Sequence, residues 1–201
     1  MMRAVFDLVV SVVGLLLLSP AFAVIAVAIK LDSPGPVIYR QVRVGKGGRL
    51  FTILKFRSMV EDADRIAPNV SPTGDARVTR VGAFLRHWYL DELPQLVNVL
   101  KGDMSLVGPR PETPEFVALY TDDELRVLDV KPGLVGPSTV AFMDEGRLLA
   151  ASEDPESYYA TELVHARVRL DLEYATRETL RSDLRILARQ GIAIFRQRRG
   201  K

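Results

Sequence analysis

The sequence predicts a helix-rich α/β protein with a small β-hairpin, associated with a membrane. Residues 8–29 form a run of 22 uncharged and mostly apolar residues, which is unusual in a protein that is fully surrounded by water. Residues 37–56 read as two short strands around a glycine-rich turn, and residues 161–197 read as a long helical stretch. The 201 residues suffice for one hydrophobic core and an appendage.

The N-terminal segment is long enough to cross the hydrocarbon core of a bilayer, about 30 Å, as a helix. Ser19 and Pro20 stand at its centre, and a proline there removes a backbone hydrogen bond and clashes with the preceding turn. A spanning helix with a tolerated kink and a re-entrant helix-break-helix, which enters one leaflet and returns, both fit this pattern. Arg3 before the segment and basic residues after it favour the re-entrant form modestly, because neither flank is typical of an external face.

The hairpin follows the anchor. Residues 33–36, with the sequence SPGP, end the N-terminal helix. Strands are expected over 37–44 and 51–56, and Gly-Lys-Gly-Gly at 45–48 forms the turn between them. This glycine-rich turn lacks the spacing and the Ser/Thr of a P-loop, so we interpret it as a turn and not as a phosphate cradle.

Three further segments are expected to be helical. Residues 59–66 form a short helix, and residues 77–90 alternate basic and apolar positions as an amphipathic helix does. Trp88 and Tyr89 would place that second helix at the depth of lipid headgroups, although packing on the protein's own core is an equal alternative. The third stretch, 161–197, is expected to break near Gly191.

Composition excludes several classes of protein. The chain has no cysteine and two histidines, so disulfides, thiolate metal sites and a histidine-rich zinc site are not expected. A formal net charge of +2 gives no reason to expect nucleic-acid binding. Basic residues concentrate instead in 30–57, after the apolar segment, and in 177–201, the C-terminal helices. Such flanks suit an anionic membrane surface, at roughly 1 kcal/mol per well-placed charge.

The most informative block is LDELPQLVNVLKGDMSLVGPRPE, residues 90–112. It contains adjacent carboxylates, Asp91 and Glu92, and an arginine, Arg110, held between two prolines. Asp91 could simply cap a helix that begins near Pro94. The nearby arginine favours a second interpretation, because its planar fork suits phosphate oxygens and magnesium binds one or two carboxylates together with substrate phosphates. The block therefore indicates phosphate chemistry with a divalent metal.

A second acidic pattern, Asp62-Ala63-Asp64, has the form DxD by which many glycosyltransferases hold a nucleotide-bound metal. Patterns of three residues occur by chance often, and this one lies in a polar segment. We interpret it as a solvated surface, with a metal-binding role as the alternative.

Several blocks in one order resemble the bacterial sugar transferases that form the monotopic phosphoglycosyl transferase superfamily, in its small single-domain form. They are the anchor with Ser19-Pro20, then SPGPVIYRQVRVG, FTILKFRSM, DARVTRVGAFLR, the block of residues 90–112, and KPGL. The resemblance covers essentially residues 1–140. It implies a monotopic membrane protein with a re-entrant anchor at 1–30, interfacial amphipathic helices, and a catalytic domain at 31–201 on the cytoplasmic face of the bacterial inner membrane.

The resemblance also implies a mechanism. Asp91 attacks the β-phosphorus of a UDP-sugar, expels UMP and forms a phosphosugar-aspartyl intermediate. The phosphate of a polyprenol carrier, usually undecaprenyl phosphate, then takes the sugar phosphate and starts the assembly of a surface glycan. Glu92 would hold Mg²⁺. By their positions in the motifs, four basic residues are expected to bind phosphate: Lys55, Arg57, Arg86 and Arg110.

One departure from the family concerns the sugar. After KPG the family often continues with Thr-Gly and a nearby Gln, whereas residues 134–146 read LVGPSTVAFMDEG. The difference leaves the identity of the sugar open, with an N-acetylated UDP-hexosamine as the family-level expectation. The C-terminal helices are assigned to membrane association or to contacts in a homodimer, and downstream glycosyltransferases are expected partners.

Two other functions compete with this one. A non-catalytic scaffold of a glycan-assembly complex would need neither Asp91 nor Arg110. A metal-dependent glycosyltransferase would use Asp62 and Asp64 and release UDP instead of UMP. The released nucleotide distinguishes the two chemistries.

Overall fold

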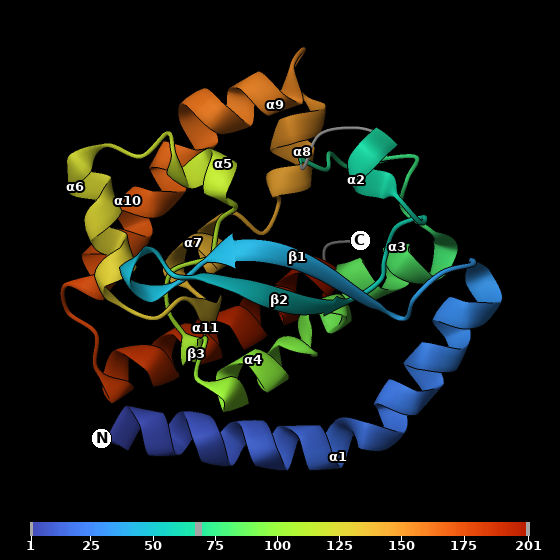
Figure 1. Cartoon of the computed structure of the whole chain (residues 1–201), viewed down its shortest axis with the longest axis horizontal. Helices are drawn as coiled ribbons and strands as arrows, with labels where there is room; N and C mark the ends of the chain where they lie inside the picture. Colours follow the sequence, from blue (N-terminus) through green and yellow to red (C-terminus); the bar gives the residue numbers. More distant parts are fainter. Residues whose placement is uncertain (1, 67–69, 200–201) are drawn as a thin grey trace.

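The computed structural model describes residues 2–66 and 70–199, and its helices surround a central hairpin (Figure 1). The hairpin consists of β1 (Ile38–Val44) and β2 (Leu50–Phe56). The first helix, α1, spans Met2–Asp32 and lies along the outside of the molecule. The last helix, α11, spans Leu180–Arg199 and lies behind the hairpin. The helix-rich α/β class with a small hairpin is confirmed.

Helix α1 continues through Pro20 and is not interrupted there. It changes direction near its middle, where the lower blue segment in Figure 1 turns upward. Proline explains the bend, because its ring clashes with the preceding turn and leaves one carbonyl without a partner. Ser19 Oγ donates a hydrogen bond to Leu16 O at 2.8 Å. The predicted break is therefore a bend within one helix.

Both halves of α1 pack on the same body. In the first half, Arg3 forms ion pairs with Glu178 Oε2 and Asp183 Oδ2, each at 2.6 Å. In the second half, Ile29 is buried in a cluster with Phe56 and Leu85. Between these ends the helix is mostly exposed and is long and apolar enough to cross a membrane, alone among the described helices.

The hairpin forms within one residue of the strand bounds that were predicted, 37–44 and 51–56. β1 and β2 are antiparallel, with Ile38 opposite Phe56 and Val44 opposite Leu50. Gly47 and Gly48 adopt φ values of 65° and 76°, in the left-handed region that glycine occupies without steric cost. β2 contributes Ile53 to the core cluster that contains Leu96 and Val99. It contributes Phe56 to a second cluster, with Ile29 and Leu85, so the hairpin packs into both clusters.

The two central helices are shorter than predicted. Helix α2 spans Ala63–Ile66 and α3 spans Arg80–His87. Helix α3 begins where it does because the Thr79 side chain accepts a hydrogen bond from Gly82 N. Its amphipathic character is confirmed over this shorter range, since Leu85 is buried whereas the polar residues Arg80 and His87 are exposed.

The main core lies between the hairpin and α4 (Gln95–Lys101), α10 (Val164–Ala175) and α11. It also contains β3 (Ser105–Val107), which pairs in parallel with β4 (Gly133–Val135). This small second sheet was not predicted, because strands of three residues are too short for a visible alternation. The remaining elements are short: α5 (Pro114–Val117), α6 (Asp122–Leu125), η3 (Arg126–Asp129), α7 (Pro137–Ala141), α8 (Glu145–Ala150), α9 (Pro155–Tyr158) and η4 (Tyr159–Leu163).

The predicted break near Gly191 is wrong. The C-terminal stretch is interrupted between α10 and α11, at residues 176–179. There Thr179 Oγ1 accepts a hydrogen bond from Ser182 N at 3.1 Å, which starts α11 as a capping residue does. Gly191 lies inside α11, because one glycine lowers helix stability without ending the helix.

The fold yields a prediction about two glycines. A Cβ at Gly82 would overlap the backbone carbonyl of Ser58, which cannot move without disrupting the start of α3. Gly82→Ala is expected to destabilise the protein by about 1–3 kcal/mol. A Cβ at Gly191 meets no atom within 4 Å, so Gly191→Ala should stabilise by roughly 0.5–1 kcal/mol. Thermal unfolding in detergent measures both, and equal melting temperatures for the two variants would contradict the described packing of α3.

Candidate active site

The predicted carboxylate pair lies in η2 (Leu90–Glu92), a single 3₁₀ turn between α3 and α4. Tyr89 precedes it with φ 54°, a left-handed conformation that is unfavourable for an aromatic residue. This reversal turns the chain from α3 into η2, where Asp91 is 8% exposed. The N-cap of α4 is Pro94, without a side-chain hydrogen bond, so the interpretation of Asp91 as a helix cap is wrong.

Glu92 is held by two cations. Lys55 Nζ, from β2, lies 2.7 Å from Glu92 Oε1 and donates a hydrogen bond to it. Arg110 Nη1 lies 3.6 Å from the same oxygen. The structure therefore brings Lys55, Glu92 and Arg110 together from three separate parts of the chain, as the sequence predicted.

The two adjacent carboxyl groups have opposite electrostatic environments. Burial and the charge of Glu92 raise the pKa of Asp91, which Lys55 and Arg86 only partly counteract. Burial also acts to raise the pKa of Glu92, but Lys55 and Arg110 outweigh it, so that pKa is lowered. Glu92 is thus the fixed anion of the pair, and Asp91 is a carboxylate whose negative charge is poorly solvated.

Arg86 and Arg110 reach the site from opposite sides. Arg86, on α3, donates a hydrogen bond from Nη1 to Ser71 Oγ at 2.8 Å. Arg110 follows β3, and its backbone N–H donates to Asp171 Oδ2 at 2.9 Å. Burial acts to lower the pKa of Arg110, but the charges of Glu92 and Glu112 outweigh it and raise this pKa, so the guanidinium remains charged at any physiological pH.

Arg57 has a different environment from the other predicted phosphate binders. Its guanidinium donates hydrogen bonds to the carbonyls of Ser33 and Pro34, in the turn after α1. The residue is 5% exposed and borders the site, but these partners hold its charged end against the turn. The geometry supports a role for Arg57 in fixing the anchor to the hairpin.

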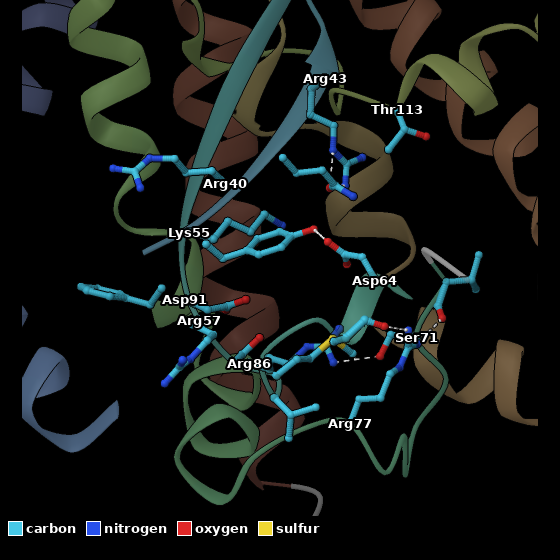
Figure 2. A pocket seen from close by; sticks show the side chains of 18 of the residues that line it. Arg40, Arg43, Lys55, Arg57, Asp64, Ser71, Arg77, Arg86, Asp91 and Thr113 are labelled. Carbon is cyan, nitrogen blue, oxygen red and sulfur yellow. Dashed lines mark hydrogen bonds between the residues drawn. The ribbon is translucent and has the colours of Figure 1, made fainter. Parts of the chain in front are cut away.

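Two cavities meet at Asp91. The hairpin cavity, of 450 Å³, lies beside β1, β2 and α2, and the loop cavity, of 550 Å³, lies beside α3 and the segment 142–147. Six residues line both: Lys55, Ser71, Arg86, Asp91, Arg110 and Glu145. In Figure 2 the side chains of Lys55 and Asp91 point into the hairpin cavity, whereas Arg40 points away from it. A ligand in either cavity can therefore reach the Asp91 carboxylate.

The alternative acidic pattern borders the hairpin cavity without forming a metal cluster. Asp64 accepts a hydrogen bond from Tyr39 Oη at 2.8 Å, and Asp62 pairs with Arg65 at 3.7 Å on the surface. In the part of the chain that the structure describes, no group of three or more His, Cys, Asp or Glu residues could hold a metal ion. Protein carboxylates alone would not complete a metal site there.

Magnesium fits Asp91 and Glu92 only together with a substrate. The pair supplies two oxygen-bearing side chains, and Glu92 is ionised because Lys55 and Arg110 lower its pKa. Mg²⁺ characteristically takes one or two protein carboxylates and completes its shell with water and substrate phosphates. The donor set thus suits a metal that arrives with a phosphate ligand.

Several residues at the site were not predicted. Arg43 Nη1 lies 3.3 Å from Glu112 Oε2, and Tyr159 Oη donates to Glu112 Oε1 at 2.8 Å. The sequence could have indicated Arg43. Tyr39 lies opposite Lys55 in the hairpin, and Arg43, four residues further along the same strand, points to the same face. No sequence pattern indicated Arg167 and Asp171 on α10, because only the folded chain brings that helix to Arg110.

The chain is similar in sequence to several known proteins. The UDP-N-acetylgalactosamine-undecaprenyl-phosphate N-acetylgalactosaminephosphotransferase of Aeromonas hydrophila is 48% identical over 134 residues, which are 65% of this chain and 31% of that protein. A UDP-glucose:undecaprenyl-phosphate glucose-1-phosphate transferase of Caulobacter vibrioides is 39% identical over 93% of this chain and 67% of its own length. The enzyme of that name in Escherichia coli is 39% identical over 90% of this chain and 37% of its own length. The chain thus spans about a third of two of these three relatives.

The family described as bacterial sugar transferase matches residues 1–197. That range includes α1, the hairpin, η2, the Arg110 loop and nearly all of α11. The chain belongs to the bacterial sugar transferase family.

Proposed function

We propose that this protein transfers a sugar 1-phosphate from a UDP-sugar to undecaprenyl phosphate, releases UMP and thereby starts the assembly of a surface glycan. The observation that carries the proposal is the buried Asp91 carboxylate at the junction of two cavities, flanked by Lys55, Arg86 and Arg110. Relatives whose names specify UDP-sugars and undecaprenyl phosphate support it.

The reaction needs two displacements at phosphorus. In the first, an Asp91 oxygen bonds to the β-phosphorus, the bond from that phosphorus to the bridging oxygen breaks, and UMP leaves with the electron pair. In the second, an oxygen of the lipid phosphate attacks the same phosphorus, and the Asp91 carboxylate is released. A covalent route divides one difficult displacement into two easier ones. Burial assists the first step, since a poorly solvated carboxylate is a better nucleophile.

Lys55, Arg86 and Arg110 neutralise the charge of the phosphates. All three line both cavities, so each of them lies beside the space that either substrate would occupy. Positioning and electrostatic stabilisation supply most of the catalysis in phosphoryl transfer. The fixed anion Glu92 keeps Lys55 and Arg110 in place when no substrate is bound.

Magnesium would be held by Glu92 and Asp91 together with the substrate's diphosphate. When bound, it supplies a Lewis acid that polarises phosphoryl oxygens. Glu92 suits this role because its pKa is lowered and it stays ionised, while Lys55 can move to the incoming phosphate.

The contacts of α1 favour a re-entrant anchor. A straight spanning helix would carry its first residues to the opposite side of the bilayer. Here Arg3, near the start of α1, forms an ion pair with Asp183, and Ile29, near its end, is buried against the same globular part of the protein. Pro20 bends the helix between these two contacts. We therefore place the bend in one leaflet of the bacterial inner membrane and the catalytic domain on the cytoplasmic face, where both substrates can be reached without crossing the bilayer.

The first test replaces the nucleophile. Asp91→Asn is expected to abolish UMP release and covalent labelling by a UDP-sugar, because an amide oxygen cannot form the acyl phosphate. Asp103→Asn is a matched control in the same sequence block, at a position that lines neither cavity. The measurement uses detergent-solubilised protein with magnesium, undecaprenyl phosphate and a panel of UDP-sugars.

The released nucleotide separates the alternatives. Release of UDP, lost in an Asp62→Asn/Asp64→Asn double variant, would indicate a metal-dependent glycosyltransferase instead. Full activity of Asp91→Asn would contradict the covalent mechanism. Absence of any nucleotide release across the panel would favour the scaffold.

A second test concerns Glu92. Glu92→Gln removes the charge that holds Lys55 and Arg110, and loss of one partner of a buried ion pair costs about 3–5 kcal/mol. We expect both half-reactions to slow and the magnesium concentration for half-maximal rate to rise. The measurement is a magnesium titration of UMP release, and an unchanged midpoint would remove Glu92 from the metal site.

The pH dependence gives a third test. Asp91 must be ionised to attack, and burial raises its pKa, so the rate should fall as the pH drops through a value above that of an ordinary aspartate. Arg86 lowers this pKa, and Arg86→Gln should therefore shift the acidic limb of the profile to higher pH. Arg80→Gln, on the exposed face of the same helix, should leave the limb in place. If the acidic limb lay at the same pH in both variants, the assignment of that limb to Asp91 would be wrong.

A further inference from the structure

Helix α10 places a buried arginine at the loop cavity. Arg167 is 4% exposed and lines this cavity together with Asp91, Glu92 and Arg110. Arginine is almost never fully buried unless its charge is paired, because removal of the ion from water is costly. The position therefore raises the question of what compensates this charge.

The partners of Arg167 in the folded chain do not use all of its donors. Within the described residues, Nε and Nη1 of Arg167 make no hydrogen bond, although Nη1 lies against Glu145 Oε2. Asp171, one helical turn further, has its oxygens occupied by Arg110 N, Ser138 N and Ser138 Oγ. The guanidinium thus has Glu145 as its ion-pair partner at Nη1 and an unpaired Nε, beside a cavity of 550 Å³.

The local charge favours an anion at this position. Burial and the neighbouring Arg110 lower the pKa of Arg167 to about 10, so the two guanidinium groups repel each other in a poorly solvated site. An anion between them would relieve this repulsion, and a planar guanidinium matches the geometry of phosphate oxygens.

We propose that Arg167 is an additional phosphate-binding residue of the active site, and that Glu145 occupies it when no substrate phosphate is present. The proposal rests on the proposed function, which supplies two candidate phosphates: the diphosphate of the nucleotide-sugar and the phosphate of the lipid carrier. It also brings the C-terminal helix α10 into the active site, beyond the membrane or dimer contacts expected from the sequence.

The primary experiment measures UDP binding by calorimetry, with magnesium and full-length protein in detergent. Loss of a charge-assisted hydrogen bond weakens binding by about tenfold or more, and this is expected for Arg167→Gln. Arg169→Gln is the matched control on the same helix, since that side chain is 75% exposed and pairs only loosely with Glu124 at 3.6 Å. A folded Arg167→Gln protein with wild-type affinity for both substrates would overturn the proposal.

A second variant covers the case in which Arg167→Gln does not fold. Glu145→Gln removes the charge that competes for Arg167, so UDP should bind several-fold more tightly than to the wild type. If the two residues formed only a structural ion pair, the variant would bind both UDP and undecaprenyl phosphate equally or more weakly, and that result would contradict the proposal.

Michaelis constants identify the source of the phosphate. An increase for the UDP-sugar alone in Arg167→Gln assigns the nucleotide diphosphate, and an increase for undecaprenyl phosphate alone assigns the lipid carrier. The UDP titration contains no chemical step, so it tests Arg167 independently of the role of Asp91.

Discussion

The contact between Lys55 and Glu92 is the interaction on which the active site depends. Adjacent carboxyl groups in η2 are buried, and their mutual repulsion would favour protonation or exposure of the turn. Lys55 from the hairpin and Arg110 from the loop after β3 offset this repulsion at Glu92. The ion pairs form only when the hairpin, η2 and that loop are docked together, so the folded arrangement and the charge state of Asp91, the proposed nucleophile, are coupled.

Helix α10 supports this arrangement from behind. Asp171 accepts hydrogen bonds from the backbone N–H groups of Arg110 and Ser138. It therefore connects the loop after β3 with α7. Such bonds to a buried carboxylate are stronger than neutral ones, because the charge is poorly solvated. One turn earlier, Arg167 faces the loop cavity and Glu145. The C-terminal third of the chain therefore contributes to the walls of the candidate active site.

The anchor is attached to the body through polar contacts as well as apolar ones. Asp7, near the start of α1, accepts hydrogen bonds from Ser105 Oγ at 2.6 Å and from Leu106 N at 3.2 Å. Both donors belong to β3, and the loop that follows β3 carries Arg110. Helix α1 thus contacts the strand that leads to Arg110, which we propose to be a phosphate-binding residue.

Lys55 was expected from the family resemblance, whereas local patterns in the sequence determined the apolar anchor with its central proline, the hairpin between residues 38 and 56, and the candidate group Asp91, Glu92 and Arg110. Each rests on short-range chemistry: an uncharged run, a glycine turn, or a motif held between prolines. The tertiary structure alone decided that Arg57 bonds to the turn after α1, that the C-terminal helices separate at 176–179, and that α10 reaches the site. These outcomes depend on which distant groups compete for one guanidinium or one carboxylate, and no local pattern records that competition.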